Sequence, residues 1–228
     1  MNLEVLEEVK KKALEDHVPI IMDDTLNVIK EYLEELKPKR ILEIGAAVGY
    51  SSSQFAKISG EQVKIDTIEL DEVRYNQAVE NIKNIGLENN INVILGNAVE
   101  ILPTLNGPYD VIFIDANKGK YPVFLAEALR MSHKGTIIFA DNVLYKGYVL
   151  GDYNKHKQRT AVRHLREYIA EAISNERFDT QISTVGDGLA ISIVKWLKIL
   201  KIFLKFIIKA SFWKVDLNQK RWKSIEKK

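Results

Sequence analysis

Three side chains that could supply oxygen ligands to a cation stand at the ends of two predicted strands near the middle of the chain. Asp115 ends the strand 110–116, and Asp141 and Asn142 end the strand 135–141. Neighbouring strand ends of a parallel sheet lie about 5 Å apart, so these oxygens can converge on one cation. Two carboxylates and an amide oxygen suit Mg²⁺ completed by water and substrate. The alternative is loop capping, for which Asp and Asn are common after strands. Three such ligands together favour the metal.

A lysine lies close to these ligands in the sequence. Lys118 follows Asp115 by three residues, in the segment DANKGKY. Held beside a cation and an apolar wall, a lysine can serve as a general base for a substrate hydroxyl. Lys120, in the same loop, is the contrasting case of a solvated charge. We therefore predict Lys118 as the catalytic residue.

A glycine-containing turn and a glutamate indicate a nucleoside cofactor. Gly45 and Gly49 join the strand 40–45 to a helix, and glycines there let backbone NH groups approach a ligand. Glu69 ends the next strand, where its carboxylate can accept hydrogen bonds from both ribose hydroxyls. The alternatives are an ordinary strand–turn–helix and a solvated strand end. The two features together favour the cofactor.

A basic segment connects the strand 135–141 to a helix at 157–174, with tyrosines interleaved. Basic side chains can contact phosphates, and tyrosines can stack on unpaired bases. The alternative is a solvated helix face, in which Arg163 and Glu167 pair at helical spacing. Nucleic acid is favoured on this feature alone. The predicted contacts are Lys146, Lys155, Lys157, Arg159 and Arg163.

The elements that position these residues alternate along the first 194 residues. Amphipathic patterns predict helices at 3–15, 23–36, 51–58, 71–85, 98–104, 121–132 and 157–174. Apolar runs predict strands at 40–45, 63–70, 91–96, 110–116, 135–141, 178–185 and 188–195. Nearly all-apolar strands indicate a parallel sheet covered on both faces, and the turn Gly186-Asp187-Gly188 favours a closing antiparallel hairpin. The predicted fold is α/β, a Rossmann-like doubly wound sheet of seven mostly parallel strands.

Composition and charge bound the class of protein. The length of 228 residues fits one globular domain with an appendage. The composition, 46% hydrophobic and 28% charged, excludes disordered and collagenous classes of protein. The lack of cysteine excludes disulfides, zinc ribbons and thiol nucleophiles. The start lacks a signal-peptide core and no run of 18 apolar residues occurs, so we expect a cytoplasmic protein.

The charge is divided unevenly between two parts of the chain. Residues 195–228 carry a net charge of +9, and residues 1–194 carry −7. We therefore predict a catalytic domain at 1–194 and a basic amphipathic extension at 195–228. The extension could lie on a membrane surface, pack on its own domain or a dimer mate, bind RNA, or be a terminus without selected function. Its wide apolar face favours packing or lipid contact.

Four motifs resemble one family in order and spacing: ILEIGAAVGYSS, TIELDE, FIDANKGKY and ADNV. They are similar to motifs of the metal-dependent class I O-methyltransferases, which include the catechol and caffeoyl-CoA enzymes. The resemblance covers about residues 17–194. It implies Mg²⁺ on Asp115, Asp141 and Asn142, with Lys118 as the base. It also implies S-adenosylmethionine at Gly45, Ser51, Glu69, Asn97, Ala98 and Asp115.

Within that family, the segments HVPI, DNVLYKGYV and VGDGLAIS resemble the bacterial tRNA 5-hydroxyuridine methyltransferases. The implied reaction converts 5-hydroxyuridine at the tRNA wobble position to 5-methoxyuridine. The implied partners are the tRNA anticodon loop and a second copy of the chain in a homodimer. Two positions depart from the family. Asn97 stands where Asp is frequent, and Ala190 stands where catechol enzymes place an acidic substrate ligand, which counts against a catechol.

Two other functions compete with tRNA methylation. One is O-methylation of a small catechol-like or hydroxy-aromatic metabolite, and the basic, tyrosine-containing segment favours tRNA over it. The other is a non-catalytic nucleotide- or RNA-binding module, and the metal ligands with Lys118 argue against it.

Overall fold

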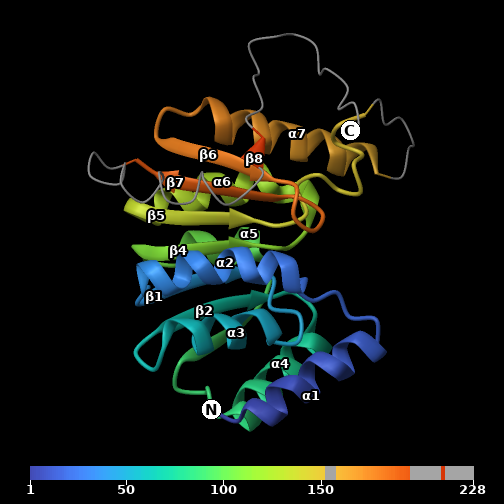
Figure 1. Ribbon diagram of the computed structural model, residues 1–228, viewed down its shortest axis with the longest axis vertical. Helices are drawn as coiled ribbons and strands as arrows, with labels where there is room; N and C mark the ends of the chain where they lie inside the picture. The colour runs from blue at the N-terminus through green and yellow to red at the C-terminus, as the bar shows by residue number, and fades with distance from the viewer. Residues whose placement is uncertain (152–157, 196–211, 214–228) are drawn as a thin grey trace.

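A central β-sheet divides the chain into two helical layers (Figure 1). The computed structural model describes residues 1–151, 158–195 and 212–213. The helices are α1 (Leu3–Glu15), α2 (Asp23–Leu36), α3 (Tyr50–Ser59), α4 (Glu72–Ile85), α5 (Ala98–Ile101), α6 (Tyr121–Arg130) and α7 (Arg159–Ser174), with 3₁₀ turns η1 (Leu102–Thr104) and η2 (Lys118–Lys120). The strands are β1 (Arg40–Ile44), β2 (Lys64–Glu69), β3 (Ile91–Leu95), β4 (Tyr109–Ile114), β5 (Ser132–Ala140), β6 (Phe178–Ser183), β7 (Leu189–Val194) and β8 (Phe212–Trp213).

The strand order is β3-β2-β1-β4-β5-β7-β6-β8. The first five strands in this order are parallel, and β7 runs antiparallel to both β5 and β6. The predicted α/β fold, its seven strands and its closing antiparallel hairpin are therefore confirmed. The sequence prediction missed β8, whose two residues pair with Ile182 and Ser183 of β6 and extend the sheet by one short edge strand.

Alternating side chains of the strands fill two separate cores. Ile41 and Phe113 face the layer of α1 to α4, whereas Leu42 and Ile112 face the layer that contains α6 and α7. Burial on both faces explains why these strands are apolar without interruption. Each layer packs against one face, and the sheet between them fixes the relative positions of its strand ends.

The carboxyl ends of β3, β2, β1, β4 and β5 lie side by side along one edge of the sheet, because these strands are parallel neighbours. Gly45 follows β1 with a φ of +107°, and a Cβ atom there would collide with the backbone carbonyl of Asp115. Only glycine allows the loop after β1 to lie so close to the end of β4. The turn after β1 and the residues after β4 are thereby brought into one site.

None of the helices in the described part of the chain is long and apolar enough to span a membrane. Most of the predicted extension, residues 196–211 and 214–228, lies outside the described residues. The domain boundary after Val194, the role of the extension and the cytoplasmic location therefore stay predictions.

Candidate functional site

One pocket of about 940 Å³ opens along the carboxyl edge of the sheet. It is lined from the ends of all five parallel strands and from the segment between α1 and α2. The residues predicted from the sequence that line it are Gly45, Ser51, Glu69, Asn97, Ala98, Asp115, Lys118, Asp141, Asn142 and Lys146. The strand order places the predicted nucleoside ligands at one end of this pocket and the predicted metal ligands at the other.

The carboxylate of Glu69 fastens the turn after β1 to the end of β2. Its Oε2 accepts a hydrogen bond of 2.7 Å from the backbone NH of Ala47, and its Oε1 accepts bonds of 2.9 Å from Leu70 and Asp71. A carboxylate has about four acceptor positions, so this one can still accept from ligand hydroxyls. Glu69 thus both shapes the turn and offers acceptors to the pocket.

Asn97 lies at the β3 end of the pocket and begins α5. Its Oδ1 accepts from the backbone NH of Val99 at 3.1 Å, and its Nδ2 donates to Glu100 at 3.1 Å. The side chain is exposed, so the amide keeps hydrogen-bonding capacity toward the pocket. Ala98, the first residue of α5, lies beside it on the pocket wall.

Beneath the turn, a buried glutamate holds Ser51. Glu43 is 0% exposed and accepts hydrogen bonds of 2.5 Å from the hydroxyls of Ser51 and Thr67. Burial disfavours the charged carboxylate and raises the pKa of Glu43 to about 7, although these hydroxyls oppose the shift. Ser51 is therefore fixed on the pocket wall by a carboxyl group that titrates near neutral pH.

This raised pKa predicts a pH effect on stability. Between its ordinary value of 4.5 and about 7, Glu43 binds more protons in the folded state than in the unfolded state, so its ionisation lowers stability as pH rises. Glu43→Gln removes that contribution. We expect the free energy of unfolding of the variant, relative to wild type, to rise by on the order of 3 kcal/mol across this range. Denaturant titrations at a series of pH values check this, and a constant difference would contradict it.

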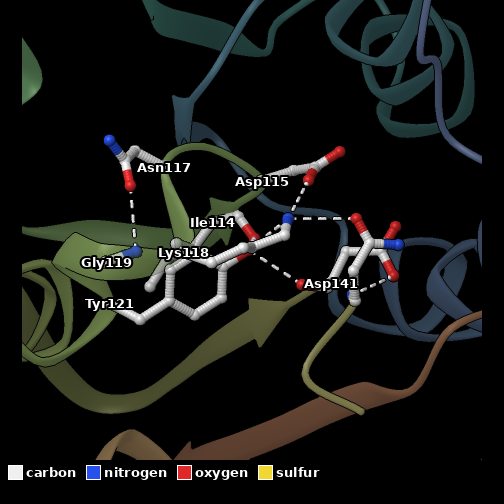
Figure 2. Close-up of polar contacts among 8 residues, drawn as sticks. Ile114, Asp115, Asn117, Lys118, Gly119, Tyr121 and Asp141 are labelled. Carbon is white, nitrogen blue, oxygen red and sulfur yellow. Dashed lines mark hydrogen bonds and ion pairs between the residues drawn. The ribbon is translucent and has the colours of Figure 1, made fainter. Parts of the chain in front are cut away.

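At the other end of the pocket, Lys118 connects the ends of β4 and β5 (Figure 2). Its Nζ donates to Asp115 Oδ1 at 2.8 Å, to Asn142 Oδ1 at 3.0 Å and to the Tyr121 hydroxyl at 2.9 Å. The oxygens of Asp115 and Asn142 therefore already converge on one positively charged atom. The two strand ends thus bring these two oxygens together, and their role as metal ligands stays a prediction.

Asp141 adds a buried negative charge to this end of the pocket. Its side chain is almost fully buried, and its Oδ1 accepts from the backbone NH of Asn142 at 2.7 Å. Burial, and next the negative charge of Asp115, raise the pKa of Asp141 to about 7. Because the charge of Asp115 disfavours the ionised form of Asp141, a cation bound beside both carboxylates would relieve their repulsion.

The donor set of this end fits Mg²⁺. Among the described residues, no three His, Cys, Asp or Glu side chains form a metal cluster. A cation here would therefore rely on Asp115, Asp141 and the amide oxygen of Asn142, together with water and substrate. Hard oxygen ligands with open positions are the arrangement that Mg²⁺ prefers.

The pocket also contains residues that the sequence analysis did not single out. Tyr50 and Arg74 line its wall, and the Nη1 of Arg74 is buried without a hydrogen-bond partner among the described residues. Asp187, in the β6–β7 turn, lines the pocket and accepts from the backbone NH of Lys146 at 2.5 Å. Tyr121 is fully buried behind Lys118. Tyr121 stands three residues after Lys118, a helical spacing that could have indicated its contact.

The structure brings only part of the predicted basic segment to the pocket. Lys146 lines it, whereas Arg159 and Arg163 lie on α7 outside its lining. Arg163 pairs with Glu167 at 3.6 Å, as the solvated-face alternative proposed. Lys155 and Lys157 lie outside the described residues. Contact of these residues with nucleic acid stays a prediction.

Comparisons with known proteins show the family of this chain. A sequence profile of the O-methyltransferase family matches residues 2–195. The chain belongs to the O-methyltransferase family. Catechol O-methyltransferase of Niastella koreensis is 37% identical over 166 residues, which cover 69% of this O-methyltransferase and 74% of the relative.

Solved structures resemble this O-methyltransferase over most of its length. A putative caffeoyl-CoA O-methyltransferase from Staphylococcus aureus has a TM-score of 0.78 and 35% identity, covering 83% of this chain and 92% of that one. An O-methyltransferase from Bacillus cereus, solved in complex with SAH, has a TM-score of 0.76 and 27% identity, covering 84% and 91%. The resemblance to this family in the sequence is therefore confirmed.

Proposed function

We propose that this O-methyltransferase transfers the methyl group of S-adenosylmethionine to the 5-hydroxyl of 5-hydroxyuridine at the tRNA wobble position, with Mg²⁺ assistance. The product is 5-methoxyuridine. The observation that carries the proposal is that one pocket is lined both by the glycine turn with Glu69 and by Asp115, Lys118 and Asn142.

Two different sets of pocket residues would hold the cofactor and the metal ion. Gly45, Ser51, Glu69 and Asn97 would hold S-adenosylmethionine, as supported by the SAH complex of the Bacillus cereus relative. This cofactor supplies an electrophilic methyl group on a sulfonium. Asp115, Asp141 and Asn142 would hold Mg²⁺, which supplies positive charge next to the acceptor hydroxyl and lowers its pKa.

The remaining steps belong to the chain's own residues. Lys118, held at the strand ends of β4 and β5, accepts the proton of the acceptor hydroxyl at Nζ once it has become a neutral amine, because the ammonium form has no lone pair. The acceptor oxygen forms a bond to the methyl carbon as the bond from that carbon to sulfur breaks, which leaves neutral S-adenosylhomocysteine. The fixed turn at Gly45 and the fixed strand end at Asp115 align the methyl donor with the acceptor.

The choice of a tRNA acceptor rests on chemistry and charge. A 5-hydroxyuracil places its hydroxyl beside the C4 carbonyl, so its two oxygens can chelate one cation as a catechol can. A wobble base is unpaired and can enter the pocket without melting a duplex. Lys146 on the pocket wall, and the basic residues Arg159 and Arg163 on α7, support a partner with phosphates.

A second candidate is a small catechol-like or hydroxy-aromatic metabolite. The relative from Niastella koreensis is named a catechol O-methyltransferase, which favours this candidate. Ala190 is fully buried in β7, opposite Ala140 of β5, and offers no acidic ligand to such a substrate. The acidic Asp187 of the neighbouring turn does line the pocket, so a small acceptor remains a real competitor.

Cells that lack this protein provide the test in vivo. We expect mass spectrometry of their tRNA nucleosides to show 5-hydroxyuridine accumulating and 5-methoxyuridine lost. The wild-type gene should restore 5-methoxyuridine, and an Asp141→Ala gene should not, because that change removes a predicted metal ligand. Unchanged levels of both nucleosides would favour the small-molecule acceptor.

A further inference from the structure

The ammonium group of Lys118 has a complete set of acceptors. It carries three N–H donors, and its three partners are the side-chain oxygens of Asp115, Asn142 and Tyr121 at 2.8, 3.0 and 2.9 Å. Two of these oxygens are the proposed metal ligands. The third, on Tyr121, is not. Figure 2 shows the lysine lying between the tyrosine hydroxyl and the carboxylate of Asp115.

The hydroxyl of Tyr121 is held firmly in place. It is 0% exposed, and its O–H donates to the backbone carbonyl of Asp141 at 2.8 Å, which leaves a lone pair for Lys118. Its ring packs edge-on against Tyr168, with ring centroids 5.6 Å apart, and Lys118 Nζ lies 5.1 Å from the centroid of the Tyr121 ring. The Tyr121 hydroxyl therefore keeps its position if the Lys118 side chain moves.

A divalent cation and the Lys118 ammonium compete for the same two oxygens. When a cation binds Asp115 and Asn142, the lysine loses two of its three acceptors and is repelled by the metal charge. We propose that Tyr121 is a positioning residue that keeps Lys118 Nζ in the site after the cation takes these oxygens. The inference rests on the proposed metal-dependent function.

Removing the Tyr121 hydroxyl and removing the Lys118 ammonium should change the metal affinity in opposite directions. Without the Tyr121 hydroxyl, the ammonium depends entirely on Asp115 and Asn142 and opposes the cation more strongly. Without the Lys118 ammonium, both oxygens are free for the cation. The effect of Tyr121 on metal affinity must therefore disappear when Lys118 is absent, which a purely structural role would not produce.

The test is a double-mutant cycle on Mn²⁺ binding to the full-length chain, measured by calorimetry without cofactor or acceptor. The proteins are wild type, Tyr121→Phe, Lys118→Met, the double variant and Tyr168→Phe. We expect Lys118→Met to tighten Mn²⁺ binding roughly tenfold, because a neighbouring positive charge is removed. Tyr121→Phe should weaken it about three- to tenfold in the wild-type background and leave it unchanged in the Lys118→Met background.

Tyr168→Phe is the matched control. Tyr168 is a fully buried tyrosine that touches the Tyr121 ring, and its hydroxyl is not a partner of Lys118. This variant should bind Mn²⁺ like wild type. In turnover, Tyr121→Phe should lower kcat roughly 10- to 100-fold with the acceptor KM nearly unchanged, because the lysine is misplaced.

Three results would overturn the inference. Equal weakening by Tyr121→Phe in both backgrounds would mean that the tyrosine acts through the Asp141 carbonyl and not through Lys118. Equal effects of Tyr168→Phe and Tyr121→Phe would indicate general loss of packing. Absence of Mn²⁺ binding in every protein would overturn the metal-dependent function as well, so the two failures can be distinguished.

Discussion

Lys118→Ala is expected to lower kcat for methyl transfer by roughly 10²–10⁴, the range in which general bases contribute. The lysine contacts both strand ends that carry the predicted metal ligands, Asp115 and Asn142, and its side chain is only 17% exposed. The Kd of S-adenosylmethionine should stay nearly unchanged, because the predicted cofactor residues Glu69 and Asn97 stand at the ends of β2 and β3, whereas Lys118 lies at the ends of β4 and β5.

Lys120→Ala is the matched control for this prediction. Lys120 lies in the same 3₁₀ turn η2 and is exposed, so its loss should leave kcat close to the wild-type value. Steady-state kinetics and cofactor binding by calorimetry provide the two measurements. If Lys118→Ala lost cofactor affinity in proportion to activity, the lysine would be a binding residue and not the base.

Asp141→Ala should abolish turnover. The change removes a buried carboxylate whose pKa is raised to about 7 by burial and by the charge of Asp115, and which is a predicted ligand of the proposed cation. A chelator should likewise inhibit the wild-type protein, and added Mg²⁺ should restore its activity. The assay is methyl transfer from labelled S-adenosylmethionine before and after chelation.

The isosteric change Asp141→Asn controls for loss of folding. It keeps the shape of the side chain, and the backbone carbonyl that accepts from Tyr121 is unaffected. We expect it to retain a cooperative unfolding transition while activity falls and the Mg²⁺ requirement shifts to higher concentration. Full wild-type activity in metal-free buffer would contradict the metal-assisted account.

The fold could be predicted largely from local patterns. Uninterrupted apolar runs such as 110–116 mark strands buried on both faces, and Asp71 and Gly86 bound α4 by capping it at each end. β8 could not be found this way. It is a two-residue strand whose pairing with Ile182 and Ser183 is set by long-range contact, and the surrounding lysine spacing indicates a helix instead.

The part of the candidate site that stands at the ends of strands could be predicted from the sequence. Asp115 follows β4 directly and Asn142 is the second residue after β5, and parallel pairing of β4 with β5 brings the two together. The spacing of Tyr121 from Lys118 could have indicated their contact, whereas the hydrogen bond from Tyr121 to the Asp141 carbonyl joins distant parts of the chain and has no local signal.

Arg166 lies on α7 with Arg159 and Arg163, which we predict to contact nucleic acid. In the structure its guanidinium donates to the backbone carbonyls of Val149, at 3.0 Å, and of Gly151. It therefore fixes the loop after β5 to α7. A sequence cannot distinguish an arginine that supports a loop from one that faces a phosphate, because the two differ only in side-chain direction.

The most direct test of the central claim uses the purified protein with S-adenosylmethionine and Mg²⁺. Transfer RNA that carries 5-hydroxyuridine at the wobble position and a catechol are supplied together at equal concentration, and the products are measured by mass spectrometry. We expect 5-methoxyuridine in the tRNA, formed only with Mg²⁺ and lost in Asp141→Ala. Methylation of the catechol with unmodified 5-hydroxyuridine in the tRNA would contradict it.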